Sequence, residues 1–443
     1  MDKEPDVQKE QVPAPKKASA DKSIGKSIKK IFWSGILITL LMVLVKWGLE
    51  HTSLYQGGQR AAYEWLQARL SPPHRRNDLP VMIVDIRDLE YMTKEIEGEK
   101  YSVTPREKLI PLIEEVAAQQ PKVIALDIDF SPHKIGFLDP LDPIYFRKFA
   151  ALSQVYQVPI FLGVHRSRNR PREFWLGDPE FESLGANVEN PDDNRKMYEW
   201  TSDAGGRKQL TLCNALASVF PPEAKTRRRF PAWAVRQISE TQKENGRKAG
   251  EFLVDFSALG TLEDTRLKTT KREVVKDQGW TLRDKAVLIG DGSLYDARDS
   301  VIIPMQGQTK PVPGIYLQAA AAYTLITSPI YEVTAPGRFL LDFGLALIVL
   351  GGVIVVRILL RSSGSSFAQL SVTYFFIVLV TVVVVIVGIL LVHITHVLWD
   401  DFFFVLLGLW FHPIVELILS PLGRAIKAIP DAFRVVFVSE QKE

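Results

Sequence analysis

Hydrophobic residues along this chain fall into runs of two lengths, and each length predicts a different kind of structure. The long runs reach the roughly 20 residues that a helix needs to cross about 30 Å of hydrocarbon. They cover residues 31–49, 339–360, 367–392 and 402–422. The pattern therefore predicts four transmembrane α-helices, one N-terminal and three C-terminal.

The short runs lie between the first two long ones. They are apolar at successive positions instead of alternating, which is typical of strands buried on both faces of a parallel sheet. They cover residues 79–86, 122–130, 158–165, 251–258 and 286–291. Helical patterns alternate with them at 104–120, 143–155, 210–220, 231–242 and 314–326, whereas 166–203 has the composition of loops. This order predicts an α/β domain with a mainly parallel sheet.

The helix at 104–120 carries a recognisable start signal. Thr104 is expected to be its N-cap, Pro105 its first residue and Glu107 the partner in a capping box.

Basic residues beside the long runs predict how the chain crosses the membrane. Lysines before the first run, arginines between the second and third, and basic residues after the fourth place these flanks in the cytoplasm. No small-residue cleavage site follows the first run, so we expect it to be retained as an anchor. The predicted domains are a disordered basic cytoplasmic tail (1–30), a span (31–49), an extracytoplasmic α/β domain (50–337), three spans (338–422) and a short cytoplasmic tail (423–443).

Composition removes several classes of function. The 443-residue chain has a net charge of +3 and no basic stripe interleaved with aromatic residues, so nucleic acid is not an expected partner. Its single cysteine, Cys213, excludes an intrachain disulfide and cysteine-rich zinc sites. The chain has no nucleophile elbow, no H-E-x-x-H helix and no P-loop. We therefore expect no enzyme activity, no catalytic residues, no metal centre and no cofactor.

Acidic residues stand at the ends of three predicted strands and in the loop after the last of them. In open α/β sheets, ligands bind beyond the carboxyl ends of the strands. Carboxylates gathered there would suit a divalent cation or a cationic small molecule through oxygen ligands. The alternative is that each aspartate only caps a helix or closes a turn. The candidate ligand-binding residues at these positions are Asp85, Asp127, Asp129, Asp291 and Asp296.

Ionisable residues within the predicted spans are a second group of candidates, because charges in a membrane are costly and tend to be paired or functional. Lys46 and Asp342 are predicted at similar depth near the outer surface, where they either pair with each other or extend separately to the interface. His412 and Glu416 are four residues apart and share a helix face. They either contact a partner helix, with a pH-sensitive histidine, or are satisfied inside their own bundle.

The order of motifs resembles a known family. A signal-anchor run is followed by IVDIRDL, PKVIALDIDFS, LRDKAVLIGDGSLYDARDSVIIP and VPGIYLQAAAAYTLI, and then by three closely spaced apolar runs. This order is similar to that of the CHASE domain of the second type, an extracytoplasmic sensory domain of bacterial cyclases and histidine kinases. The positions that match its pattern are Asp85, Asp127, Gly290, Asp296, Pro304 and Gly314. Two positions depart from it: Gln318 stands where a histidine is usual, and Asp291 where threonine or serine is usual.

The resemblance implies a multi-pass protein of the bacterial inner membrane that senses a ligand outside the cytoplasm, and it adds Gln318 to the candidate ligand-binding residues. The segment 423–443 is too short for an output domain, so we expect a relay to a separate membrane protein or cytoplasmic effector. A homo-oligomer would also be compatible with such a relay. The alternative is a structural subunit of a membrane complex, with the external domain as its docking platform.

Overall fold

The computed structural model describes residues 46–49 in part, 52–70, 79–130, 142–164, 184–221, 235–268, 281–293, 300–327, 331–360 and 366–399, with short gaps in several of these ranges. The chain divides into two compact units. The first, which we call the α/β unit, comprises Gly57–Arg338 and Ile386–Phe402. The second, the helical unit, comprises Met1–Gln56, Phe339–Val385 and Phe403–Glu443.

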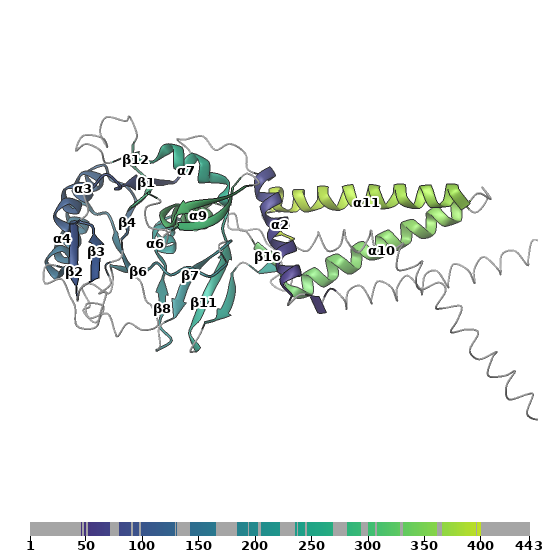
Figure 1. The fold of residues 1–443 in the computed structure, drawn as a ribbon, viewed down its shortest axis with the longest axis horizontal. Coiled ribbons are helices and arrows are strands. Elements are labelled where there is room, and N and C mark those ends of the chain that lie inside the picture. Colours follow the sequence, from purple (N-terminus) through teal and green to yellow (C-terminus); the bar gives the residue numbers. More distant parts are fainter. Residues whose placement is uncertain are drawn as a thin grey trace, which may run out of the picture. The chain divides into compact units, whose positions relative to one another are not determined.

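A six-stranded sheet forms the centre of the α/β unit, with strand order β12-β1-β13-β4-β5-β6 and every neighbouring pair parallel (Figure 1). The strands are β1 (Val81–Asp85), β4 (Val123–Asp127), β5 (Ile160–Val164), β6 (Gly185–Asn187), β12 (Leu267–Lys268) and β13 (Ala286–Gly290). The predicted parallel sheet is thus confirmed, together with the predicted strands at 79–86, 122–130, 158–165 and 286–291. β13 is the last of these strands in the chain, yet it lies between β1 and β4.

Helices cover both faces of this sheet (Figure 1). On one face, α3 (Arg106–Ala118) and α4 (Asp142–Tyr156) share a buried core with alternate residues of the strands, such as Val84, Leu126 and Ile289. On the other face lie α6 (Leu212–Ser218), α7 (Leu259–Thr265) and α9 (Gly314–Thr327), which contact β1, β4 and β13. Burial on both sides explains why these strands are apolar at successive positions.

A second sheet is antiparallel and was not expected from the hydrophobic pattern. Its order is β10-β11-β7-β8, and its strands are β7 (Lys196–Ser202), β8 (Lys208–Leu210), β10 (Ser239–Gln242) and β11 (Lys248–Leu253). The expectation of loops throughout 166–203 is therefore wrong at β7, and also at β6 of the parallel sheet. The strand expected at 251–258 begins earlier, as β11, and is followed by the 3₁₀ turn η4 (Phe256–Ala258).

The helix expected at 231–242 is also wrong, because the described part of that segment forms β10 and β9 (Val235–Arg236). β9 pairs with β16 (Tyr331–Val333), and β10 pairs with β11. Backbone hydrogen bonds to β16, far away in the sequence, and to the nearby strand β11 thus outweigh a local helical pattern.

Three further pieces complete the α/β unit. The antiparallel hairpin β14 (Ser300–Met305) and β15 (Gln308–Pro313) runs directly into α9. A second hairpin joins β2 (Met92–Ile96) to β3 (Glu99–Val103), and β17 (Val397–Leu398) pairs with β16.

The start of α3 differs by one residue from the capping motif. Pro105 is the N-cap, with an extended ψ of 117° and no side-chain cap hydrogen bond. Thr104 therefore lies outside the cap, and its expected role there is wrong. The backbone carbonyl of Pro105 accepts hydrogen bonds from Lys108 and Leu109 instead.

Three long helices lie wholly or partly in the helical unit: α2 (Ser53–Leu70), α10 (Ala335–Leu360) and α11 (Ser366–Thr395). The second and third predicted spans are therefore helical. Within the described part of the chain, one stretch, Tyr374–Leu391, is long and apolar enough to cross a membrane. The predicted span 402–422 lies outside the described residues, as does most of 31–49.

Candidate functional site

The strand register brings the predicted acidic strand ends to one edge of the parallel sheet. Asp85 at the end of β1 is the register partner of Gly290 in β13, and Gly290 is in turn the partner of Asp127 in β4. The two carboxylates therefore flank a glycine on neighbouring strands, at the edge where ligands of open α/β sheets bind. Asp127 is half-buried there. Asp129 and Asp296 lie outside the described residues.

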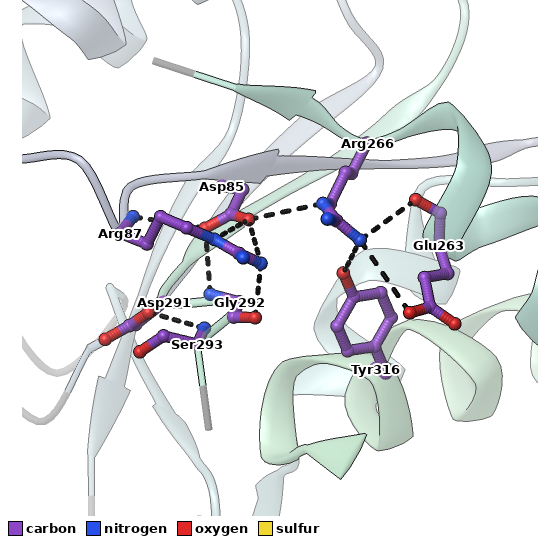
Figure 2. Close-up of polar contacts among 8 residues, drawn as sticks. All are labelled: Asp85, Arg87, Glu263, Arg266, Asp291, Gly292, Ser293 and Tyr316. Atoms are coloured by element: carbon purple, nitrogen blue, oxygen red, sulfur yellow. Dashed lines mark hydrogen bonds and ion pairs between the residues drawn. The ribbon is translucent and has the colours of Figure 1, made fainter. Parts of the chain in front are cut away.

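Asp85 is the centre of a polar cluster at this edge (Figure 2). It is fully buried, and an isolated buried carboxylate would be very unstable. Its Oδ1 accepts hydrogen bonds from the backbone N–H of Arg87 at 3.1 Å and of Gly292 at 2.9 Å. The Nε of Arg87 donates to Oδ2 at 2.6 Å. The carboxylate is thus held by its own strand end and by the loop after β13.

That loop, residues 291–293, is fitted closely around the carboxylate. A Cβ on Gly292 would lie 2.5 Å from Oδ2 of Asp85, so only glycine allows this approach. Asp291 closes the loop on itself, because its Oδ1 accepts a hydrogen bond from the backbone N–H of Ser293 at 2.7 Å. The turn-closing alternative considered for Asp291 is therefore what its described geometry supports.

Arg266 connects Asp85 to helix α9 (Figure 2). Its Nε lies 3.5 Å from Oδ2 of Asp85. Its Nη1 donates to the hydroxyl of Tyr316 at 3.1 Å and to the backbone carbonyl of Glu263 at 3.3 Å. Tyr316 lies in the first turn of α9, and Glu263 lies in α7. One arginine therefore ties together β1, α7 and α9.

The charges of the cluster are fixed near neutral pH. Burial lowers the pKa of Arg87, but the hydrogen bond and the charge of Asp85 more than offset this, so its pKa lies above the ordinary value. Burial raises the pKa of Tyr316, and the neighbouring Arg266 lowers it only in part. The guanidinium of Arg87 stays charged and the phenol of Tyr316 stays protonated, so the cluster acts as a set of hydrogen bonds and ion pairs. Contact of Asp85 with a ligand stays a prediction, and it would compete with two arginines.

Gln318 lies two residues after Tyr316 in α9, about half a helical turn further along. Its side chain is buried, with 2% of the residue exposed. Its Nε2 donates to Oδ1 of Asn190 at 3.1 Å and to the backbone carbonyl of Val188 at 3.4 Å, in the segment that follows β6. Its Oε1 is buried and accepts no hydrogen bond from the residues that the structure describes. Gln318 therefore belongs to the same edge of the α/β unit as the aspartates, but not to the Asp85 cluster.

The candidates in the apolar helices fall into two groups. Lys46 and Asp342 are in contact through Nζ and Oδ2, so the predicted pair is present in the structure. Their role in coupling stays a prediction. His412 and Glu416 lie outside the described residues.

The sequence pattern did not predict the partners of Asp85 in this cluster, two arginines and a tyrosine. Arg87 follows Asp85 by two residues in the IVDIRDL motif, so its pairing had a local signal. Arg266 and Tyr316 had none, because they meet Asp85 only after α7 and α9 pack against β1. Among the described residues, no three His, Cys, Asp or Glu side chains come together as ligands for a metal ion.

Comparison with known proteins gives one match. The family model of the CHASE2 domain matches residues 36–358, well over half of the chain. No curated protein and no solved structure matches the chain significantly. The matched range contains the parallel sheet, the Asp85 cluster and α9, and it confirms the resemblance carried by the strand-end motifs. This protein belongs to the CHASE2 domain family.

Proposed function

We propose that this protein is a sensor of the bacterial inner membrane, whose α/β unit lies outside the cytoplasm and relays ligand or partner binding through transmembrane helices to a separate protein. CHASE2 domains are extracytoplasmic sensory domains, which supports the sensory role. We also propose that the chain has no enzyme activity of its own, because the polar cluster around Asp85 is neutralised by arginines and holds no activated nucleophile or base.

Membrane anchorage is supported by the surfaces of α10 and α11. Large apolar side chains along both helices are more than a third exposed, a cost that lipid or a partner helix would remove. The described examples are Phe339, Leu340, Leu341, Leu347, Ile348 and Val355 of α10, and Tyr374, Phe375, Val378, Leu379, Val382, Val383, Ile386, Val387, Leu390 and Ile394 of α11. Four spans, with both ends of the chain in the cytoplasm, are the topology we propose.

The position of α9 is the observation that supports the proposed relay. Its first turn is bonded to the strand-end cluster through Tyr316 and Arg266. Near its other end, the hydroxyl of Thr324 accepts a hydrogen bond from the backbone N–H of Asp255 at 2.8 Å. The chain then passes through the short strand β16 into α10, which begins at Ala335. A change at the strand ends that shifts α9 would therefore be transmitted along the chain into the apolar helices.

Topology is tested by cysteine labelling of the full-length protein in spheroplasts. In a Cys213→Ala background, single cysteines replace Asp284, which is exposed in the α/β unit, and Ser363, between α10 and α11. A membrane-impermeant maleimide should label position 284 in intact spheroplasts and position 363 only after permeabilisation. A cysteine at Arg434 should behave like the one at position 363. Equal labelling of positions 284 and 363 would contradict the proposed topology.

Sensing is tested on the full-length protein in lipid nanodiscs. A ligand that binds only the folded state raises the melting temperature by mass action. We expect at least one compound in a broad panel of metabolites and ions to do so. A panel without any effect, combined with stable co-purification of other membrane proteins, would instead support a structural subunit of a membrane complex.

The relay is tested with Tyr316→Phe, which keeps the ring but removes the contact between its hydroxyl and Arg266. Ligand binding should change hydrogen exchange in α10 of the unmodified protein, and much less in the variant. Equal changes in both proteins would exclude this contact as part of the relay.

A further inference from the structure

Gln318 carries a feature that the Asp85 cluster does not explain. Its side chain is buried and its amide nitrogen donates two hydrogen bonds, but its Oε1 accepts none from any described residue. The two acceptors on the nitrogen side, the Val188 carbonyl and Asn190 Oδ1, set the orientation of the amide. A buried acceptor without a donor costs about 1–3 kcal/mol, so native structures seldom retain one without a role.

The register of the parallel sheet determines which residues lie near this oxygen. Leu126 and Leu162 are register partners, so the next residues, Asp127 and Gly163, are neighbours on β4 and β5. Both leucines belong to the core under α3 and α4, so strand alternation points Asp127 to the opposite face, toward α6 and α9. A Cβ on Gly163 would lie 3.0 Å from the side chain of Val188, the residue that Gln318 contacts. The Gln318 amide and the Asp127 side chain therefore lie on the same face of the sheet, with the amide beside the segment that follows β6 and Asp127 at the end of β4, two strands away.

The chemistry around Gln318 is that of acceptors. The described acceptors are its own Oε1, the Val188 carbonyl, Asn190 Oδ1 and, two strands away, the carboxylate of Asp127. The donors of these same residues are the two amide nitrogens, and that of Gln318 already donates to two acceptors. A group with several N–H donors and a positive charge would satisfy the buried oxygen and be attracted by the carboxylate. The oxygen itself is buried, whereas Asn190 is exposed and Val188 is half-buried, so a ligand would approach it past this segment.

We propose that Gln318 and Asn190 form a subsite for the ammonium group of a small primary amine. This subsite rests on the proposed sensory function and names the ligand class for it. The geometry makes Gln318 a ligand-contacting residue on α9, two residues after Tyr316, so the amine would bind the helix that leads toward α10.

The test uses full-length protein in nanodiscs and measures dissociation constants by calorimetry or thermal shift. The probes are ethanolamine and putrescine, with choline as the matched control, because choline carries the same charge without an N–H donor. We expect the primary amines to bind and choline to bind at least about tenfold more weakly, because a hydrogen bond to a charged donor is lost. Equal binding of choline would overturn the proposal.

Variants separate contact with a ligand from support of the fold. Gln318→Met has a similar size but no acceptor, so it should weaken amine binding at least about tenfold. Its melting temperature without ligand should fall, because the Val188 carbonyl and Asn190 Oδ1 lose the hydrogen bonds that the Gln318 amide nitrogen donates. Gln318→Glu should retain or tighten amine binding. Thr324→Val, a control on the same helix, should lower the melting temperature yet leave amine affinity unchanged, because Thr324 bonds the backbone of Asp255.

Two outcomes contradict the subsite directly. The first is unchanged amine affinity in Gln318→Met. The second is a loss of amine affinity in Thr324→Val as large as in Gln318→Met, which would show that lower affinity follows from lower stability alone. If amines fail while an anion, a metal ion or a neutral metabolite raises the melting temperature, this subsite is wrong and the sensory function stands.

Discussion

Asp85 shows how a single residue can organise the edge of a sheet. It has no exposed surface, so its charge is stabilised only by neighbours: two arginines and the backbone N–H groups of Arg87 and Gly292. These partners come from β1, from the loop after β13 and from the end of α7. A buried ion pair of this kind adds little net stability by itself, but removal of one partner is costly.

Asp85→Asn should therefore destabilise the protein strongly. The amide removes the negative charge opposite Arg87 and Arg266, which we expect to lower the free energy of unfolding by about 2–3 kcal/mol. Thermal unfolding of the full-length protein in detergent measures this change. Asp284→Asn is the matched control: Asp284 is exposed with a φ of 64°, a conformation that asparagine tolerates well. Equal melting temperatures for the two variants would contradict the role of Asp85.

Gly292→Ala should act on the same site from the loop side. The new Cβ would lie 2.5 Å from Asp85 Oδ2, so either the carboxylate or the loop has to move, at a cost of about 2 kcal/mol or more. Gly57→Ala is the same substitution in open space within α2, and it should stabilise by about 0.5–1 kcal/mol. The two melting temperatures should therefore shift in opposite directions. A shift of the same sign in both would refute the close fit around Asp85.

At the scale of elements, the central helices are held by burial more than by capping. Almost the whole of α9 is buried, from Gly314 to Ile326, although an exposed helix of this composition would lack a polar face. α6 lies beside it and contacts β4, β5 and β13. In the helical unit, a Cβ on Gly352 of α10 would overlap the ring of Phe376, so α10 and α11 pack closely at this glycine. Glycine here serves packing, not a turn.

Cys213 reports on the stability of α6. It is fully buried, and burial raises the pKa of its thiol to about 12, against an ordinary value of 9.0. The folded protein should therefore resist a thiol reagent at pH 8 and react only when α6 opens. The stabilising effect of keeping this thiol protonated is fully present below pH 9 and is lost as the pH rises toward about 12. Labelling rates with and without denaturant measure this protection, and Cys213→Ala gives the background. Rapid labelling of the native protein at pH 8 would contradict it.

The whole molecule is held together by contacts between distant parts of the chain. β13 pairs with β1 in the centre of the sheet, although 200 residues separate the two strands in the sequence. Lys46 and Asp342, 296 residues apart, precede and follow the α/β unit in the sequence and meet within the helical unit. Their side chains are only 13% and 9% exposed. An ion pair thus joins the two segments of the helical unit that precede and follow Gly57–Arg338 in the sequence.

A charge swap tests this ion pair. Lys46→Asp and Asp342→Lys alone should each lower the melting temperature, because each places two like charges together in a poorly solvated position. The double variant should recover at least half of the larger loss, since opposite charges again face each other. The three melting temperatures are measured on the full-length protein in detergent. Losses that simply add in the double variant would exclude a coupled pair.

Much of the architecture could be predicted from local pattern. The continuous apolar runs at 79–86 and 286–291 became neighbouring parallel strands, because a strand without a polar face has to be covered on both sides. The acidic residues after those runs met at one edge, because parallel strands end together. The pairing of Lys46 with Asp342 was one of two alternatives that their similar predicted depth left open, and the contact is present in the structure.

The sequence by itself determined which segments have to be buried and where their polar ends lie, since this depends on side-chain polarity and spacing along a few residues. Tertiary structure alone decided which partners those segments found. Residues 235–236 became a strand because β16 supplied hydrogen bonds, and Asp85 became an ion-paired centre because α7 brought Arg266 to it. Such choices depend on the free energy of contacts between residues far apart in the chain, which no local pattern contains.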